Sequence, residues 1–158
     1  MNNMELQFND LLTKLKVDNP QIKFKENEHF SWNHTKTELT YHLPKTKEED
    51  TAFISKLLHE LAHAKLNHSE YRSDAQLLKI ESSAWKLAKE LANKYGVKLS
   101  KQEQAESLQS YIDWASSMSK CPKCNKNGLQ NLQTEFICPN CSNSWRVSKS
   151  RFKRTYRR

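Results

Sequence analysis

The chain has 158 residues, of which 36% are hydrophobic and 28% charged; this suits one domain with its own core and a small second module. No apolar stretch approaches the ~20 residues of a membrane span and the N-terminus is too polar for a signal peptide, so we expect no membrane contact and a cytoplasmic location. The net charge of +8 is uneven, because residues 119–158 carry ten Lys and Arg against one acid, Glu135, and sum to +9, which leaves −1 for residues 1–118. Such asymmetry is typical of a basic binding tail.

Hydrophobic periodicity predicts the elements of the first 45 residues. Apolar residues recur at helical spacing over 4–17, which predicts an amphipathic helix that ends at Asn19-Pro20. Apolar and polar residues alternate over 21–25, 30–32 and 37–43, which predicts three strands. The strand at 37–43 has the clearest pattern and is followed by Pro44.

Capping boxes mark the starts of three further helices. In each, a Ser or Thr is followed three residues later by Glu or Gln, which allows reciprocal side-chain bonds to the helix N-terminus. They predict helices over 46–66, 73–95 and 100–118, the second stopped by Gly96. The three boxes are Thr46 with Glu49, Ser73 with Gln76, and Ser100 with Glu103.

Residues 59–63, His-Glu-Leu-Ala-His, match the pattern H-E-x-x-H inside the helix predicted for 46–66. Two histidines four positions apart share one helical face, where their imidazoles can hold one Zn²⁺ at about 2.0–2.1 Å. Glu60 can then accept a proton from a water molecule that the zinc acidifies. The motif predicts that His59 and His63 bind a catalytic zinc with Glu60 as general base; the alternative is two histidines on a solvated helix.

A catalytic zinc normally has a third protein ligand, and Glu81, His68 and Asp74 are the candidates. Glu81 lies in the next predicted helix, which a short connection would place antiparallel to the first, so its carboxylate can complete a His₂Glu site. His68 faces the opposite side of a continuous helix and is a ligand only if the chain turns back near Asn67. Asp74 lies nearer the loop. The spacing favours Glu81 and leaves His68 open.

The sequence H-E-L-A-H at 59–63, followed by E-x-x-A-W-x-x-A at 81–88, resembles the ImmA/IrrE-type metallopeptidases. The resemblance covers residues 37–95. It implies a zincin core in which His59, His63 and Glu81 bind zinc and Glu60 is the general base. Ala62 stands where the family usually has Gly, a small-for-small change. Some members are regulators whose proteolysis depends on a partner, so the resemblance implies a peptidase activity that is either constitutive or cryptic and partner-dependent.

Zincins commonly hold an extended substrate against a sheet edge beside the metal. The strand predicted at 37–43 precedes the H-E-x-x-H helix and suits that role. The alternative is an ordinary core strand.

All four cysteines fall in two C-P-x-C pairs separated by thirteen residues. In a reducing compartment this spacing indicates metal binding rather than disulfides. Residues 129–132 and 135–137 can pair as a hairpin between the two pairs. We expect a zinc ribbon whose fold depends on one structural Zn²⁺, bound by Cys121, Cys124, Cys138 and Cys141.

After the last cysteine, cations alternate with aromatic residues and no acid follows. This pattern suits phosphate contacts combined with base stacking, so it predicts binding to DNA or RNA without base-specific readout. A solubilising tail or an acidic protein partner is the alternative. The predicted nucleic-acid residues are Trp145, Arg146, Lys149, Arg151, Phe152, Lys153, Arg154, Tyr156, Arg157 and Arg158.

These patterns together predict an α+β protein with a mainly helical zincin-like domain and short N-terminal β-sheet over 1–118, a Cys₄ zinc ribbon over 119–147 and a basic tail over 148–158. A peptidase joined to a ribbon is similar in architecture to SprT-like proteases, although their downstream His-Gly pair is missing here. We expect a zinc metallopeptidase that binds two Zn²⁺ and acts on a protein substrate at nucleic acid. The alternative is a non-catalytic regulator that binds nucleic acid and keeps a structural or vestigial H-E-x-x-H site.

Overall fold

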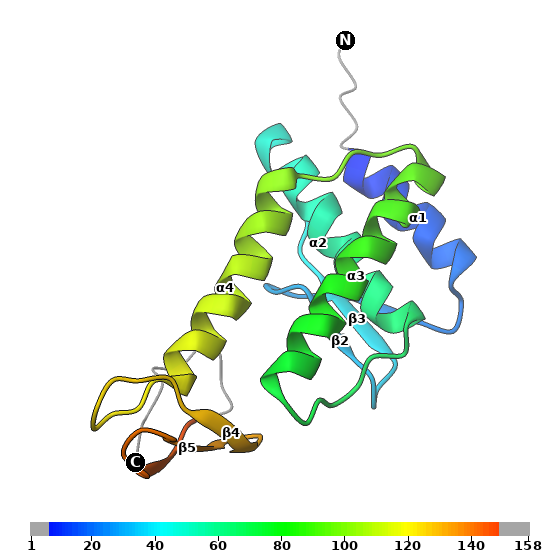
Figure 1. The fold of residues 1–158 in the computed structure, drawn as a ribbon. Helices are drawn as coiled ribbons and strands as arrows, with labels where there is room; N and C mark the ends of the chain where they lie inside the picture. The colour runs from blue at the N-terminus through cyan, green and yellow to red at the C-terminus, as the bar shows by residue number, and fades with distance from the viewer. Residues whose placement is uncertain (1–6, 149–158) are drawn as a thin grey trace. The chain divides into compact units, whose positions relative to one another are not determined.

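The computed structural model describes residues 7–148 of the chain. Over this range the chain forms four α-helices and two three-stranded β-sheets and is about half helical (Figure 1), which confirms the predicted α+β class. It divides into two compact units, Met1–Ser69 with Ile80–Glu106, and Glu70–Lys79 with Ser107–Arg158. None of the helices described is both long and apolar enough to cross a membrane.

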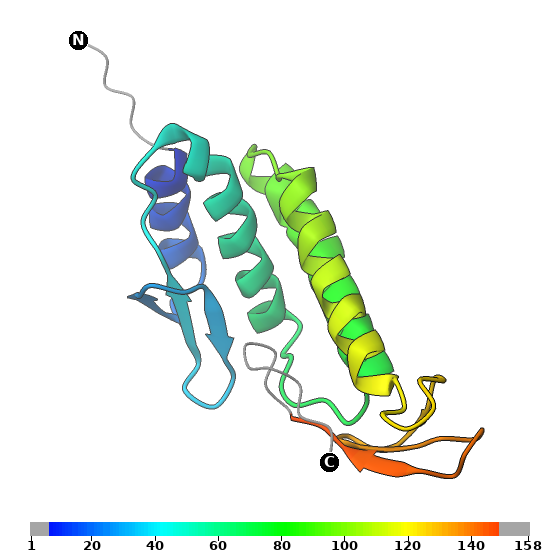
Figure 2. The same cartoon turned by 90° about the vertical axis from the view of Figure 1, so that its left-hand side faces the viewer.

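The helices of the first unit are α1 (Gln7–Asp18), α2 (Lys47–Lys65), residues 80–95 of α3 (Asp74–Tyr95) and the start of α4 (Lys101–Ser119). All four were predicted within a few residues, and Figure 2 shows α2 between α1 and α3. The apolar faces of α1, α2 and α3 are buried, as the periodicity predicted, whereas Met118 is the one buried residue of α4. The fully buried apolar side chains of the unit include Phe8, Leu15, Leu39, Ile54, Leu57, Leu58, Leu61, Ala84 and Ala88.

Side chains cap the helix N-termini at the predicted positions. Thr46 is extended and its side chain accepts a hydrogen bond from the Glu49 N–H at 3.4 Å. The Glu49 carboxylate accepts from the N–H of Lys45 at 2.7 Å, one residue before the position that a capping box implies. The other two predicted caps form the same serine bond, Ser73 with the N–H of Gln76 at 3.2 Å and Ser100 with that of Glu103 at 3.1 Å.

The C-terminus of α2 is a Schellman motif. Asn67 has a φ of 54°, in the left-handed region that Asn tolerates. The N–H of Asn67 bonds to the carbonyl of Ala64 at 3.1 Å, and the N–H of His68 bonds to the carbonyl of His63 at 3.0 Å. This pattern of bonds stops the helix and turns the chain back over its own last turn.

The sheet of the first unit contains β1 (Lys23–Glu26), β2 (Ser31–Asn33) and β3 (Glu38–Tyr41) in the order β1-β3-β2. β3 is parallel to β1 and antiparallel to β2. The strand begins at Glu38 rather than at the predicted Thr37 because Thr37 has a φ of 51° and lies in a turn. Since β3 is paired on both sides, the expectation that it holds an extended substrate is wrong, and the alternative of a core strand holds.

The second unit contains the antiparallel strands β4 (Leu129–Leu132), β5 (Glu135–Ile137) and β6 (Ser144–Arg146) in the order β4-β5-β6. The β4–β5 hairpin was predicted and β6 was not. Phe136 and Trp145 are opposite each other on β5 and β6, and their rings stack with centroids 5.6 Å apart. The buried cluster of this unit consists of Met118, Cys121, Phe136, Cys138, Trp145 and Val147.

Candidate metal centres

Helices α2 and α3 bring three ligand-type side chains together in the first unit. His59 Nε2 lies 3.0 Å from Glu81 Oε2 and 3.0 Å from His63 Nε2. His63 Nε2 lies 3.4 Å from Glu81 Oε1. Ligand atoms around a tetrahedral ion with bonds of 2.0–2.1 Å are about 3.3 Å apart. His59, His63 and Glu81 are all buried and can hold a metal ion.

The charge on Glu81 suits a ligand. Burial disfavours its carboxylate form, but hydrogen bonds and charge interactions with the two histidines outweigh burial and lower the pKa of Glu81 to about 2. The pKa of His63 is raised for the same reason: burial lowers it, but the hydrogen bond to Glu81 and the charges of Glu60 and Glu81 outweigh burial. A buried carboxylate facing two imidazoles stays charged at neutral pH and can attract a cation.

Glu60, on α2, lies beside His59, His63 and Glu81. Burial raises the pKa of Glu60, opposed by the charges of His59 and His63 and assisted by that of Glu81. Its carboxylate also accepts a hydrogen bond from the backbone N–H of Trp32 on β2, a contact that no sequence pattern indicated. A carboxylate whose pKa is raised towards neutral pH is suited to exchange protons.

Trp85 holds the ring of His59. The two rings stack with centroids 4.3 Å apart and an angle of 24° between their planes. His59 Nδ1 is buried and has no hydrogen-bond partner among the described residues. Trp85 follows Glu81 by four positions, so the helical period places both on one face of α3. That spacing is the signal in the sequence from which this contact could have been expected.

His68 and Asp74, the two alternative third ligands, lie elsewhere. His68 Nδ1 is 2.9 Å from His63 Nδ1, on the side of that ring away from Glu81. Asp74 belongs to the second unit, where its N–H donates to Gln130 Oε1 at 3.0 Å and its carboxylate accepts from Gln130 Nε2 at 3.1 Å. Neither belongs to the group of converging ligand atoms.

The four cysteines form a second group of ligands, in the second unit. The Sγ atoms of Cys121 and Cys141 are 3.6 Å apart, and those of Cys124 and Cys138 are 3.5 Å apart. A disulfide requires about 2.05 Å, and the four thiols are free. Sulfur atoms around a tetrahedral ion with bonds of about 2.3 Å are about 3.8 Å apart, so the cluster can hold a metal ion.

The two cysteine turns have the same backbone bonding. In each, the first cysteine accepts a bond at its carbonyl from the residue four positions on: Asn125 bonds to Cys121 at 2.9 Å and Ser142 to Cys138 at 2.8 Å. Asn125 and Ser142 both have a φ of 59°. This left-handed residue turns the chain so that both cysteines of a pair face one point.

The sulfur atoms cannot all carry a charge without a cation. The backbone N–H of Lys126 is the main cause that lowers the pKa of Cys124 to about 6. The backbone N–H of Asn143 has the same effect on Cys141, but burial and the neighbouring sulfurs raise the pKa of Cys141 to about 12. Several thiolates this close together would repel one another, and a bound metal ion would offset that repulsion with its positive charge.

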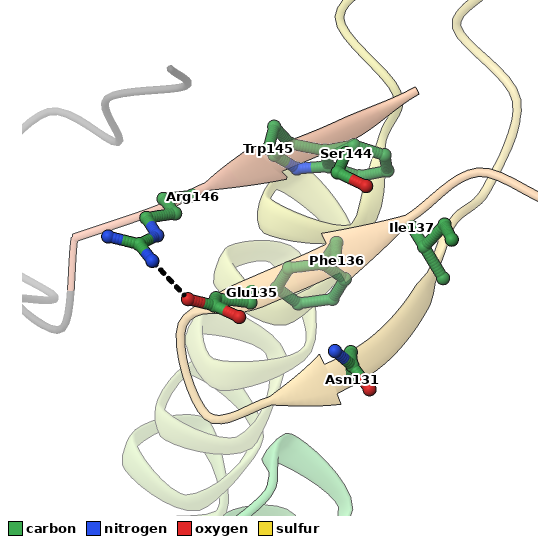
Figure 3. A pocket seen from close by; sticks show the side chains of 7 residues that line it. All are labelled: Asn131, Glu135, Phe136, Ile137, Ser144, Trp145 and Arg146. Atoms are coloured by element: carbon green, nitrogen blue, oxygen red, sulfur yellow. Dashed lines mark ion pairs between the residues drawn. The ribbon is translucent and has the colours of Figure 1, made fainter. Parts of the chain in front are cut away.

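Two predicted nucleic-acid residues lie in the described range, and one is misassigned. Trp145 is 2% exposed and its indole N–H donates to the carbonyl of Met118 at 3.0 Å, so its ring is part of the core and cannot stack on a base. Arg146 is exposed and forms an ion pair with Glu135 at 2.7 Å (Figure 3). The pair borders a pocket of about 350 Å³. The other eight predicted residues lie outside the described range: Lys149, Arg151, Phe152, Lys153, Arg154, Tyr156, Arg157 and Arg158.

Comparison with known proteins gives no match. No family model matches the chain, and neither a curated protein nor a solved structure is significantly similar to it. The likeness of residues 37–95 to the ImmA/IrrE-type metallopeptidases therefore stays a prediction.

Proposed function

We propose that the first unit is a zinc metallopeptidase of the ImmA/IrrE type. The observation that carries the proposal is the convergence of His59 Nε2, His63 Nε2 and a Glu81 carboxylate oxygen, each pair 3.0–3.4 Å apart and buried beside Glu60. Two imidazoles and one carboxylate are the ligand set of several zinc peptidases, which keep one coordination position open. The alternative is a buried hydrogen-bond network of His59, His63 and Glu81 with no metal. Such a network has no need of the Glu60 carboxylate beside it.

Glu60 acts as the general base in this proposal. His59, His63 and Glu81 would hold a Zn²⁺, which would supply the Lewis acid that polarises the scissile carbonyl and acidifies water. Glu60 takes a proton from the attacking water at a carboxylate oxygen and passes it to the amide nitrogen as the C–N bond breaks. The Trp32 N–H bonds to that carboxylate, and burial raises its pKa above the ordinary value of a glutamate, which makes it a stronger base.

Strand β2 is suited to hold the protein substrate. Within residues 7–148, β2 pairs with β3 alone, so its other edge can take an added strand except at the Trp32 N–H, which is bonded to Glu60. The bond from the Trp32 N–H to Glu60 supports this role, because it brings the strand next to the residue proposed as general base. An extended polypeptide on β2 would therefore have its backbone next to the proposed catalytic groups.

We propose that the second unit contains a Cys₄ zinc ribbon with a structural role. Sulfur distances of 3.5 and 3.6 Å and two identical cysteine turns support it. All four ligands are thiolates, which leaves no position open for substrate. Such thiolates persist in a reducing compartment, and we place the protein in the cytoplasm.

The ribbon and the basic tail are proposed to bind DNA or RNA and so to direct the peptidase, in an architecture like that of SprT-like proteases. Within the tail, residues 149–158 carry six Lys and Arg and no acid. Each phosphate contact contributes about 0.9 to the slope of log K against log salt on duplex DNA. Deleting residues 149–158 should reduce that slope by up to about 5; an unchanged slope would show that the tail does not contact phosphate.

Peptidase activity tests the proposal directly. Zinc-loaded protein should cleave an unfolded protein or a DNA-bound basic protein, assayed with and without duplex DNA. Glu60→Gln should lower kcat by about 10²- to 10⁴-fold while zinc content is unchanged. Glu90→Gln, an exposed carboxylate on α3, is the matched control and should keep full activity. If wild type cleaves neither substrate, or Glu60→Gln cleaves as fast, the site is structural or vestigial and the protein is a binding regulator.

A further inference from the structure

The Schellman motif at the end of α2 returns His68 to the ring of His63. Asn67 makes the left-handed turn, and the N–H of His68 bonds to the carbonyl of His63 at 3.0 Å. The two imidazoles then meet edge to face, with centroids 5.0 Å apart and 67° between their planes. The indole N–H of Trp32 also donates to the carbonyl of His68 at 3.2 Å. The backbone of His68 is therefore held from two sides.

A chain of hydrogen bonds runs outward from His63 through His68. His63 Nδ1 lies 2.9 Å from His68 Nδ1, and His68 Nε2 lies 3.4 Å from Ser83 Oγ. The Ser83 hydroxyl donates to the carbonyl of Ile80 at 2.8 Å. A carbonyl oxygen only accepts, so it fixes the direction of the final bond. With the Ser83 hydrogen committed to Ile80, its oxygen is left to accept from His68 Nε2–H.

The donor and acceptor roles at His68 in turn determine the tautomer of His63. A neutral imidazole with its hydrogen on Nε2 has a lone pair on Nδ1, so His68 Nδ1 accepts from His63 Nδ1–H. His63 then has its lone pair on Nε2, the atom that lies 3.4 Å from Glu81 Oε1 and 3.0 Å from His59 Nε2. The chain of bonds thus selects the one neutral tautomer of His63 that can bind a metal at the convergence point.

We propose that His68 and Ser83 are positioning residues, which hold His63 in the Nδ1–H tautomer and fix the orientation of its ring for the metal. The inference rests on the proposed function, because it requires a metal at His59, His63 and Glu81. Metal-binding histidines commonly donate their second ring nitrogen to a carboxylate or a carbonyl. Here another imidazole accepts that bond and a serine orients it in turn.

His59 provides an internal contrast. Its Nδ1 is buried without a hydrogen-bond partner among the described residues, and its ring is held by stacking on Trp85. Stacking fixes the plane of a ring but does not select the nitrogen that carries the hydrogen. The two histidine ligands are therefore positioned by different means, and only His63 should depend on His68.

Histidine NMR and zinc affinity test the proposal on the full-length chain. In zinc-loaded ¹⁵N-labelled protein, two-bond correlations should show the hydrogen of His63 on Nδ1 and that of His68 on Nε2; a hydrogen on His68 Nδ1 would overturn the proposal. In chelator competition, His68→Ala should lower the zinc affinity of the His59, His63 and Glu81 site by about 10- to 100-fold. The zinc of this site is identified by its loss in His59→Ala. His68→Asn keeps an acceptor near the position of Nδ1 and should recover most of the lost affinity.

The serine offers a matched pair of variants. Ser83→Ala should weaken this zinc less than His68→Ala does and should let the second tautomer of His68 become visible by NMR. Ser82→Ala, the exposed neighbour on the same helix, should change neither quantity. Circular dichroism of the metal-free proteins checks folding; if His68→Ala is unfolded, the comparison of His68→Asn, Ser83→Ala and wild type decides.

The two proposals fail in distinguishable ways. A wild-type chain that holds one zinc, at the cysteines, would overturn the peptidase site and this inference together. A wild-type chain with two zincs, in which His68→Ala binds both as tightly, would leave the peptidase site standing and overturn the positioning role alone.

Discussion

His59 Nε2 and Glu81 Oε2 lie 3.0 Å apart although the two residues are 22 positions apart in the chain. Both side chains are buried, and each also faces His63. The closeness of the three ligand atoms is achieved by two separate helices, so it depends on how α2 and α3 pack. Buried charged and polar groups are retained only when they have partners, and here those partners can share one cation.

Zinc content should report this arrangement directly. Purified wild-type protein should hold two zincs per chain, and both His59→Ala and Glu81→Ala should reduce the number to about one, because removing one of three ligands weakens an open site strongly. Glu90→Ala, on the exposed face of α3, should still hold two. Metal analysis after dialysis gives these numbers. One zinc in every variant would mean that the cysteines alone bind metal.

Zinc binding at the cysteines should release protons at pH 7. The pKa of Cys124 is lowered to about 6, so this thiol is already ionised, whereas the pKa of Cys141 is raised to about 12 and the thiol must lose its proton to become a ligand. Zinc affinity should therefore rise with pH. Calorimetry in buffers with different ionisation enthalpies counts the protons, with Cys141→Ser as the comparison. Binding without any proton release would contradict the raised pKa.

The hydrogen bond between Tyr95 and Asp18 should stabilise the folded state at intermediate pH and lose this effect at both low and high pH. The hydroxyl of Tyr95 donates to the Asp18 carboxylate at 2.6 Å. This bond is the main cause that lowers the pKa of Asp18 below 3.8, while burial and the same bond raise that of Tyr95 from 10.0 to about 12. A lowered acid pKa stabilises the folded state above the unfolded value of about 3.9. A raised tyrosine pKa stabilises it below 10.0, and that stabilisation is lost as the pH rises towards 12.

The free energy of unfolding of wild type minus that of Tyr95→Phe should therefore be constant between about pH 5 and 9 and should shrink at both ends. Urea titrations at pH 3, 7 and 11 measure it. Using a difference between two proteins with the same metal ligands cancels any effect of zinc loss at low pH. A difference that does not change with pH would show that the bond makes no contribution.

Gly128 should tolerate no side chain while Trp145 is present. A Cβ added at Gly128 would overlap the indole Cη2 of Trp145 and lie 3.1 Å from the carbonyl oxygen of Ile137. The indole cannot move aside easily, because it is buried against Phe136 and bonded to the carbonyl of Met118. Gly128→Ala should thus destabilise the zinc-loaded second unit by about 1–3 kcal/mol.

Trp145→Phe removes the part of the ring that the new Cβ would meet. Gly128→Ala should consequently reduce the free energy of unfolding less in a Trp145→Phe background than in wild type. Trp145→Phe is itself destabilising, because it leaves a cavity. Denaturant unfolding of the four proteins of this cycle gives the coupling. Equal costs in both backgrounds would show that the two positions do not clash.

The helices and their ends were predictable because their signals are local. Thr46, Ser73 and Ser100 each bond to the N–H three residues on, within one turn of chain. The strand β6, Ser144–Arg146, was missed because Trp145 and Arg146 were assigned with the following cations to nucleic-acid binding; it is no shorter than β2 or β5. The edge strand was misassigned for a different reason: pairing order depends on which strands meet in space, and the alternating pattern of 37–43 is the same for a central strand as for an edge.

The sequence by itself determined the ligand types, their spacing and the helix that carries His59 and His63, since all of these follow from positions within one or two helical turns. It also determined the two cysteine pairs. The tertiary structure alone decided that Glu81 rather than His68 or Asp74 joins the histidines, that Trp145 is core, and that His68 returns to the outer nitrogen of His63. The physical reason is that these outcomes depend on the packing of separate elements and on the left-handed turn at Asn67, which sends the chain back over the last turn of α2.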